Sequence, residues 1–383
     1  MKGRKFFLVS TLTLPIVCFF YFLAVDNLIV IDRKIPFTYR QFLLEASSSI
    51  SGKIVIESGS NSLHSFDAVM IEEYFNRPVI VLGDNAGYPL RHKIQSIKRH
   101  LNPGDILVLP LEWSLYIRTK NFSEDYVTGI LNGGMLSGYY KDIPLKEKIE
   151  FIFGGMSLGK IFHSTVKENV LVHSHDATVE TYQNSYSRIK KIFEGNDLTL
   201  NKNGSSKRNL DLSKKVDFKT SSCDQYLFAA LVDPARNRDS KYFPEDLSLI
   251  KNMSQRQGIK VYFSWPTVVK ARNDLLCYGA LYNSYIKDVE NNIINWVEQE
   301  GFSFIDSPKE NVYSSECYLN THYHIQQKCQ KVRTSKLIVD LYSAGLRKAD
   351  LNELNIGQEI MISKLDEYKG LLSKMYQSVI KVQ

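Results

Sequence analysis

A serine follows the first apolar run of the chain in a setting that suits acyl-transfer chemistry. Residues 53–57 lead directly into the segment 58–62, whose sequence is SGSNS. A serine at the carboxyl end of a parallel strand, just before a helix, lies where α/β sheets place their ligands. The backbone N–H of Ser60 and the start of the helix could stabilise an oxyanion, and Gly87 could supply a second N–H. The alternative is that Ser60 only begins a helix, because serine is a common helix cap.

A histidine far downstream could act as the base for this serine. His324 ends the segment 320–324, NTHYH, just before the last helix of the predicted α/β pattern. An imidazole in that position can face Ser60 across the carboxyl ends of the strands, as a general base requires. Taken alone, the segment is equally compatible with an ordinary surface or core histidine.

Polar and aromatic side chains near the same strand ends are candidates for substrate binding. Asn61 is adjacent to Ser60, Asn85 follows the second apolar run, and Glu112 follows the third. Trp265 follows the fourth run, where its ring could stack on a sugar. A packing role is the simpler interpretation of Trp265.

Short apolar runs alternate with helical patterns around these residues. This alternation predicts parallel βαβ units, and therefore a sheet with helices on both faces. The predicted strands are 53–57, 78–82, 105–109, 259–263 and 302–305, and the predicted helices are 68–75, 89–101, 282–300 and 324–343, with a further helix opened by Pro244.

Two segments do not follow the alternation. Residues 115–225 predict an insertion into the α/β domain, with helical stretches near 146–155 and 180–194. Within the insertion, residues 201–222 are polar and rich in Lys and Ser, so we expect a mobile loop. The tail, residues 347–383, carries an apolar stripe in alternating steps of four and three, which predicts an amphipathic helix. Such a helix either packs on its own domain or associates with a partner or a second copy.

The N-terminus predicts a membrane anchor. Residues 6–25 contain no charged residue and are long enough to cross a bilayer as a helix. Lys2, Arg4 and Lys5 precede them, and positive flanks stay in the cytoplasm, so we expect the domain to be exported. A cleaved signal peptide is the alternative, but the apolar run is long for one. The predicted organisation is a cytoplasmic N-terminus with anchor, 1–25, a connector, 26–50, an α/β domain, 51–346, and the helical tail.

Charge and motif content exclude several classes of function. The net charge is +7, but three of the positive charges precede the apolar segment, so the rest of the chain gives no reason to expect nucleic acid. The sequence has no phosphate-binding loop and no dinucleotide-binding motif. His173 and His175 lie close together, but two histidines at this spacing are frequent by chance. We therefore predict neither a metal nor a cofactor.

Four of the five cysteines lie in the part of the chain expected to be exported: Cys223, Cys277, Cys317 and Cys329. In an oxidising compartment they could form two disulfides in any of three pairings. We favour a Cys317–Cys329 pair, because this bond would hold the short segment that contains His324. Buried free thiols are the alternative.

Together these segments resemble the SGNH (GDSL-like) hydrolase superfamily, in particular its membrane-anchored branch that accompanies acyl transfer to bacterial surface polysaccharides. The segments that carry the resemblance are residues 54–63, 79–87, 103–112, 261–266, 323–324 and 332–334. The resemblance implies a three-layer, flavodoxin-like fold, with Ser60 as nucleophile, His324 as base, and the N–H groups of Ser60 and Gly87 as the oxyanion hole. It also implies a bacterial inner-membrane protein with a periplasmic domain, a polysaccharide substrate, and a membrane-embedded partner that supplies the acyl group.

Two positions depart from the pattern of this superfamily. An Asp usually precedes the histidine and orients the imidazole, whereas Asn320 stands here; Asn can fix a tautomer but gives no charge to an imidazolium. Asp306 is a candidate to replace it. Glu112 stands where an Asn usually follows the third strand, and a carboxylate cannot donate to an oxyanion. Two hypotheses follow: a Ser–His O-acyltransferase or esterase, or a non-catalytic scaffold in a polysaccharide assembly complex.

Overall fold

The computed structural model describes residues 13, 15–23, 39–118, 122, 144–154, 187–197, 200–207, 242–270, 287–319 and 323–380. The chain divides into two compact units. One comprises Met1–Phe37 and Phe122–Tyr182, and the other comprises Thr38–Asn121 and Gln183–Gln383. The second unit contains the α/β domain.

Four parallel strands form the centre of this α/β domain. They are β1 (Ile54–Ile56), β2 (Val79–Val81), β3 (Ile106–Leu109) and β4 (Lys260–Phe263), in the order β2-β1-β3-β4. The first three are short Ile, Val and Leu runs buried on both faces, as parallel strands under helices require. Their positions confirm four of the predicted strands. The fifth, 302–305, is reduced to one parallel bridge, between Phe263 and Phe304.

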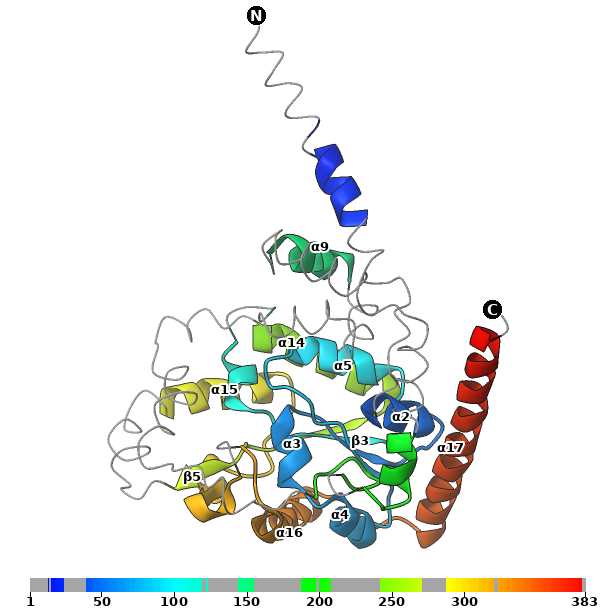
Figure 1. Ribbon diagram of the computed structural model, residues 1–383. Helices are drawn as coiled ribbons and strands as arrows, with labels where there is room; N and C mark the ends of the chain where they lie inside the picture. The colour runs from blue at the N-terminus through cyan, green and yellow to red at the C-terminus, as the bar shows by residue number, and fades with distance from the viewer. Residues whose placement is uncertain are drawn as a thin grey trace, which may run out of the picture. The chain divides into compact units, whose positions relative to one another are not determined.

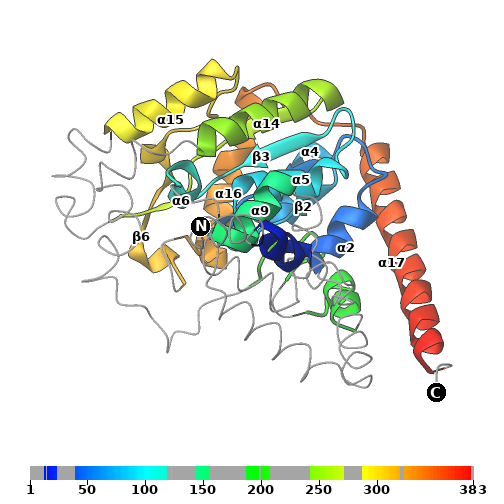
Figure 2. The same ribbon diagram turned by 90° about the horizontal axis from the view of Figure 1, so that it is seen from above.

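Helices cover both faces of the sheet, so the domain has three layers (Figure 1). Helices α4 (Ala68–Phe75) and α16 (Gln327–Ser343) lie on one face. Helices α5 (Leu90–Lys98) and α14 (Tyr242–Gln257) lie on the other, with α15 (Lys287–Gln299) beside α14 (Figure 2). The predicted α/β class with a parallel sheet is therefore confirmed. The remaining elements are α3 (Ser60–Ser65), α6 (Trp113–Tyr116), the 3-10 turns Pro308–Asn311 and Ser315–Cys317, and the parallel pair β5 (Val268–Lys270) and β6 (Val312–Ser314).

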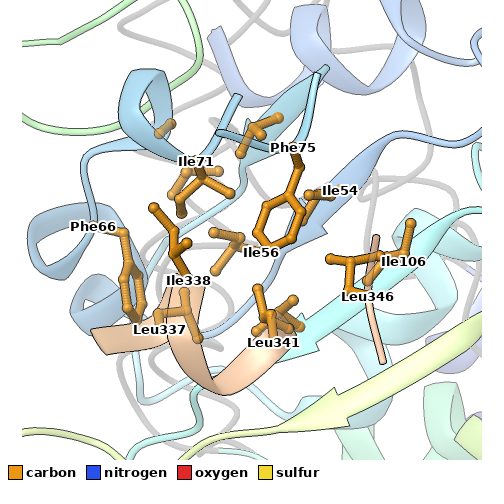
Figure 3. Packing of buried hydrophobic residues seen from close by; sticks show 14 residues of the cluster. Ile54, Ile56, Phe66, Ile71, Phe75, Ile106, Leu337, Ile338, Leu341 and Leu346 are labelled. Atoms are coloured by element: carbon orange, nitrogen blue, oxygen red, sulfur yellow. The ribbon is translucent and has the colours of Figure 1, made fainter. Parts of the chain in front are cut away.

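Alternate strand residues build the core under α4 and α16. Ile54, Ile56 and Ile106 point to this face because side chains along a strand alternate between its two sides. They meet Phe75 from α4 and Leu341 from α16 (Figure 3). Each such side chain stabilises the domain by roughly 1.5–3 kcal/mol on burial. This packing fixes β1 and α16, the two elements beside which Ser60 and His324 lie.

The α/β domain includes residues that we assigned to the connector. Helix α2 (Tyr39–Ala46) buries Phe42 and Leu43 completely or nearly so. Arg40 of α2 forms an ion pair with the buried Glu57, with Nη2 and Oε2 2.5 Å apart. The domain therefore begins before residue 51.

The prediction of a mobile loop is wrong for its first residues. Asn203 and Ser206 are buried, and the 201–207 turn packs beside the edge strand β2. Val81 N–H donates to the Asn203 carbonyl at 2.8 Å, and Ser206 N–H donates to the Leu63 carbonyl at 2.8 Å. The turn thus covers the open edge of the sheet. Residues 208–222 lie outside the described part of the chain.

The tail is helical, as predicted. Helix α17 (Leu351–Ile380) begins against its own domain: Leu354 is buried, and Gln358 donates to Glu72 Oε1 at 3.1 Å. The start of the helix therefore packs on its own domain, which was the first of the two predicted alternatives. Side chains from residue 368 onward lie outside the described ones.

The first unit is described in part. Helix α9 (Leu145–Gly154) matches the predicted stretch at 146–155, and Phe151 packs edge-on against Phe122. The predicted anchor, 6–25, is described only at residues 13 and 15–23. None of the helices in the described part of the chain has both the length and the apolar character that a bilayer crossing requires.

Candidate active site

Ser60 lies at the junction between the first strand and a short helix. Strand β1 ends at Ile56, and Ser60 is the first residue of α3. The Ser60 side chain is half-buried, and the residues before and after it are buried. Within the described part of the chain, neither its hydroxyl nor its N–H makes a hydrogen bond. Both groups therefore remain available to a ligand.

The carboxylate of Glu112 holds the turn around Ser60. Its Oε2 accepts hydrogen bonds from the Ser58 hydroxyl at 2.6 Å and from Gly59 N–H at 2.8 Å. Its Oε1 accepts from Asn61 N–H at 2.8 Å. Glu112 is fully buried, and its donors lie on both sides of Ser60. This residue, which we predicted to bind substrate, therefore supports the turn from inside the domain.

The Asn61 side chain is also used within the protein. It is fully buried, its Nδ2 donates to the Pro110 carbonyl at 2.7 Å, and its Oδ1 accepts from the Ser65 hydroxyl at 2.8 Å. Asn61 was a second candidate for substrate binding. Its contacts assign it instead to holding α3 against the end of β3.

Gly59 is required by the close approach of two backbone segments. A Cβ atom at this position would lie 2.5 Å from Glu112 Oε1 and 2.7 Å from both the backbone N and the Cα of Ala86. Real Cβ atoms do not approach backbone so closely, so one segment would have to move. The turn that carries Ser60 is thus pressed against the loop that follows β2.

We expect Gly59→Ala to destabilise the protein. The added methyl group should lower the free energy of unfolding by about 1–3 kcal/mol, as overpacking of a close-packed site usually does. It should also displace the turn that carries Ser60. Urea denaturation of the full-length protein measures the first effect. An unchanged midpoint would contradict the close approach of Gly59 and Ala86.

The loop after β2 supplies backbone groups beside this turn. Asn85 is exposed, and its Oδ1 accepts a hydrogen bond from Gly87 N–H at 2.7 Å. The predicted oxyanion donor Gly87 is therefore engaged with Asn85. The backbone nitrogen of Ala86 lies close to Gly59, and its N–H makes no hydrogen bond within the described residues.

His324 lies on a short hairpin that leads into α16. Leu319 N–H donates to the His324 carbonyl at 2.7 Å, and Tyr318 pairs with Ile325 as an antiparallel bridge. A disulfide joins Cys317 to Cys329 of α16, with the Cα atoms 5.5 Å apart. The favoured cysteine pairing is thus confirmed. Asn320, predicted to orient His324, lies outside the described residues, as do Cys223 and Cys277.

Removing this disulfide should loosen the hairpin. The bond closes a loop of 12 residues in sequence separation, so the Cys317→Ser/Cys329→Ser double variant should lose about 3 kcal/mol of unfolding free energy. Urea denaturation of the oxidised protein, before and after reduction, provides the measurement. If the double variant and the reduced wild type unfold at the wild-type midpoint, the bond does not stabilise the fold.

A second histidine meets His324. His64 lies four residues after Ser60 on α3, so the two side chains share one face of the helix, with Cβ atoms about 5–6 Å apart. The His64 ring contacts the His324 ring, with centroids 4.2 Å apart and planes tilted by 39°. His324 therefore contacts the helix that begins with Ser60. Sequence analysis missed His64, although its spacing from Ser60 was a usable signal.

Asp306 and Trp265 occupy the end of β4. Asp306 accepts hydrogen bonds from the Ser264 hydroxyl at 2.7 Å, Trp265 N–H at 2.9 Å and Asn311 Nδ2 at 2.6 Å. None of its hydrogen bonds within the described part of the chain involves His324, so Asp306 does not take the place of the orienting Asp. The Trp265 side chain is buried, which matches the packing interpretation and leaves no face for a sugar.

A cluster of buried charges lies behind the turn. The Lys93 ammonium is fully buried, donates to the Ser58 carbonyl at 3.1 Å and forms an ion pair with Asp84. Burial lowers the pKa of Lys93 to about 7 and raises the pKa of Glu57, which pairs with Arg40. These residues were not predicted, because their pairing depends on how α2, α5 and the strand ends pack together.

The described residues contain no group of three or more His, Cys, Asp or Glu side chains that could hold a metal ion. His173 and His175 lie outside them. No protein-family model, curated protein or solved structure matches this chain.

Proposed function

We propose that this protein is a serine-dependent O-acyltransferase or acylesterase with an SGNH-like domain, acting on a cell-surface polysaccharide. The observation that carries the proposal is an accessible Ser60 on helix α3, the helix that also carries His64, whose ring contacts the imidazole of His324. A hydroxyl and an imidazole that can meet are the minimum for nucleophilic acyl transfer.

The sheet topology supports the proposal. The order β2-β1-β3-β4 changes direction between β1 and β3, as in flavodoxin-like sheets. Such a switch point opens a crevice at the carboxyl ends of the two strands, where α/β proteins bind their ligands. Ser60 follows β1 and Glu112 follows β3, so the candidate nucleophile lies at this point.

In the proposed reaction the Ser60 hydroxyl attacks the carbonyl carbon of an acyl donor, and His324 takes its proton. The bond to the donor oxygen breaks, and the donor leaves as an alcohol with the proton from His324. A sugar hydroxyl then attacks the acyl-serine and gives its proton to His324. The bond between the acyl carbon and the Ser60 oxygen breaks, the sugar ester leaves, and His324 returns the proton to Ser60. Water in place of the sugar makes the protein an esterase.

Two backbone N–H groups would stabilise the oxyanion. Ser60 N–H is one of them. Because Gly87 N–H is engaged with Asn85, we propose Ala86 N–H as the second donor. Removal of one such donor typically lowers kcat by about 100- to 1,000-fold.

The setting of the reaction is part of the proposal. The N-terminal sequence supports an anchor with the α/β domain outside the cytoplasm, where surface polysaccharides are modified. A membrane-embedded partner would then deliver the acyl group. Full-rate acylation of a glycan by the purified protein with a soluble donor would contradict the need for such a partner.

The O-acyl content of the surface polysaccharide tests the function. Proton NMR would compare wild-type cells, cells with Ser60→Ala at matched protein level, and cells lacking the protein. We expect the acetyl signal to fall in the Ser60→Ala cells for a transferase, or to rise for an esterase. An unchanged signal in these cells, with an altered glycan only on deletion, would reject catalysis and support a non-catalytic scaffold.

A further inference from the structure

The contact between His64 and His324 joins two elements that are far apart in the sequence. The His64 side chain is only 7% exposed, and its ring centroid is 4.2 Å from that of His324. The nitrogen atoms of an imidazole lie on the ring edge. A neighbour on the ring face therefore fixes the plane of the imidazole without occupying the atoms that exchange protons.

Helix α16 holds both histidines in place. Its Gln330 side chain donates from Nε2 to the carbonyls of His64, at 3.4 Å, and Phe66, at 2.9 Å. The hairpin with His324 is tied to the same end of α16 by the disulfide to Cys329. The contact between the two rings is thus fixed by the hydrogen bond and the disulfide that tie both segments to α16.

We propose that His64 is a positioning residue for His324, because its ring packs against the His324 imidazole and holds it in one orientation. This inference rests on the proposed function of Ser60 and His324. By packing against one face of the His324 ring, His64 limits rotation of the side chain and directs a ring nitrogen toward Ser60. A flat side chain at position 64 is required for this role, whereas its proton is not.

Inactivation by a fluorophosphonate tests the inference without knowledge of the natural substrate. The Ser60 oxygen forms a bond to phosphorus, the P–F bond breaks, fluoride leaves, and His324 takes the serine proton. The reaction of the full-length protein gives a maximal rate constant, kinact, and a concentration for half-maximal rate, KI. A positioning residue changes kinact and leaves KI unchanged.

We expect His64→Leu to lower kinact by about 10- to 100-fold, the effect of misplacing a reacting group by about 1 Å. His64→Phe, which keeps a flat ring, should stay within about threefold of wild type. His100→Leu removes another buried histidine, on the loop after α5, and should leave kinact unchanged. Thermal unfolding of each variant shows that it is folded.

Two results would overturn the inference. Either His64→Leu reacts as fast as wild type, or folded His64→Phe reacts as slowly as His64→Leu. If the proposed function is wrong, the wild-type protein itself will not react with the fluorophosphonate at Ser60. That result differs from the two above and would also reject the role of His64.

Discussion

Ser60→Ala should abolish ester hydrolysis by the purified full-length protein while leaving its stability unchanged. With p-nitrophenyl acetate as the probe, we expect the rate to fall by about 1,000-fold or more, because removal of a serine nucleophile stops the covalent route. The free energy of unfolding should change by no more than about 0.5 kcal/mol. The reason is that the Ser60 hydroxyl makes no hydrogen bond within the described part of the chain.

The control for this result is Ser48→Ala. Ser48 is a half-buried serine of the same domain, like Ser60, and its hydroxyl donates to the Glu45 carbonyl at 2.7 Å. This variant should hydrolyse the ester at the wild-type rate. Residual hydrolysis by Ser60→Ala close to the wild-type rate would assign the activity to another group.

Glu112→Gln should lower the stability of the protein about as much as loss of the Cys317–Cys329 disulfide. The buried carboxylate accepts three hydrogen bonds, and an amide nitrogen in place of one oxygen would face N–H or O–H donors. Leaving buried donors unsatisfied costs about 1–3 kcal/mol for each group, so we expect a loss of about 3 kcal/mol in unfolding free energy. Urea denaturation measures this loss. Ester hydrolysis should fall as well, because the turn that positions Ser60 is released.

Glu245→Gln is the matched control for loss of a carboxylate. Its side chain is 55% exposed and pairs with Arg91 at 2.7 Å, a surface contact that contributes less than about 1 kcal/mol. If the two variants were equally stable, Glu112 could not be the support of the turn.

The positions of the strands along the chain could be predicted from the sequence, because each strand is determined by its own short run of apolar residues. Apolar runs such as Ile54–Ile56 and Val79–Val81, separated by helical patterns, leave few alternatives to parallel βαβ units. Helix α4 was predicted to the residue. Asp67 accepts hydrogen bonds from the N–H groups of Val69 and Met70 at its start, and Asn76 ends it with a φ of 52°.

The two features of the fold that were predicted wrongly depend on contacts between segments that are separated in the sequence. The polar 201–207 turn resembles a mobile loop, and only its hydrogen bonds to Val81 and Leu63 show that it is docked. Helix α2 lies in a stretch assigned to the connector, and its Arg40 acquires a partner only when β1 brings Glu57 beside it.

For the candidate site, sequence analysis anticipated the local setting of two residues. Ser60 follows β1 at the start of a helix, and the predicted Cys317–Cys329 disulfide holds the hairpin of His324. Glu112, predicted to bind substrate, is a buried support of the Ser60 turn. Composition gives no indication of this difference, because a carboxylate after a strand can face either the ligand or the backbone.

The identity of the nucleophile is the central claim, and mass spectrometry of a covalent adduct tests it most directly. Full-length protein would be treated with a fluorophosphonate, digested, and analysed for the modified peptide. We predict one adduct, on Ser60, that is absent from Ser60→Ala and forms slowly in His324→Gln. A folded wild-type protein with no adduct on Ser60, or an adduct that persists in Ser60→Ala, would contradict the proposal.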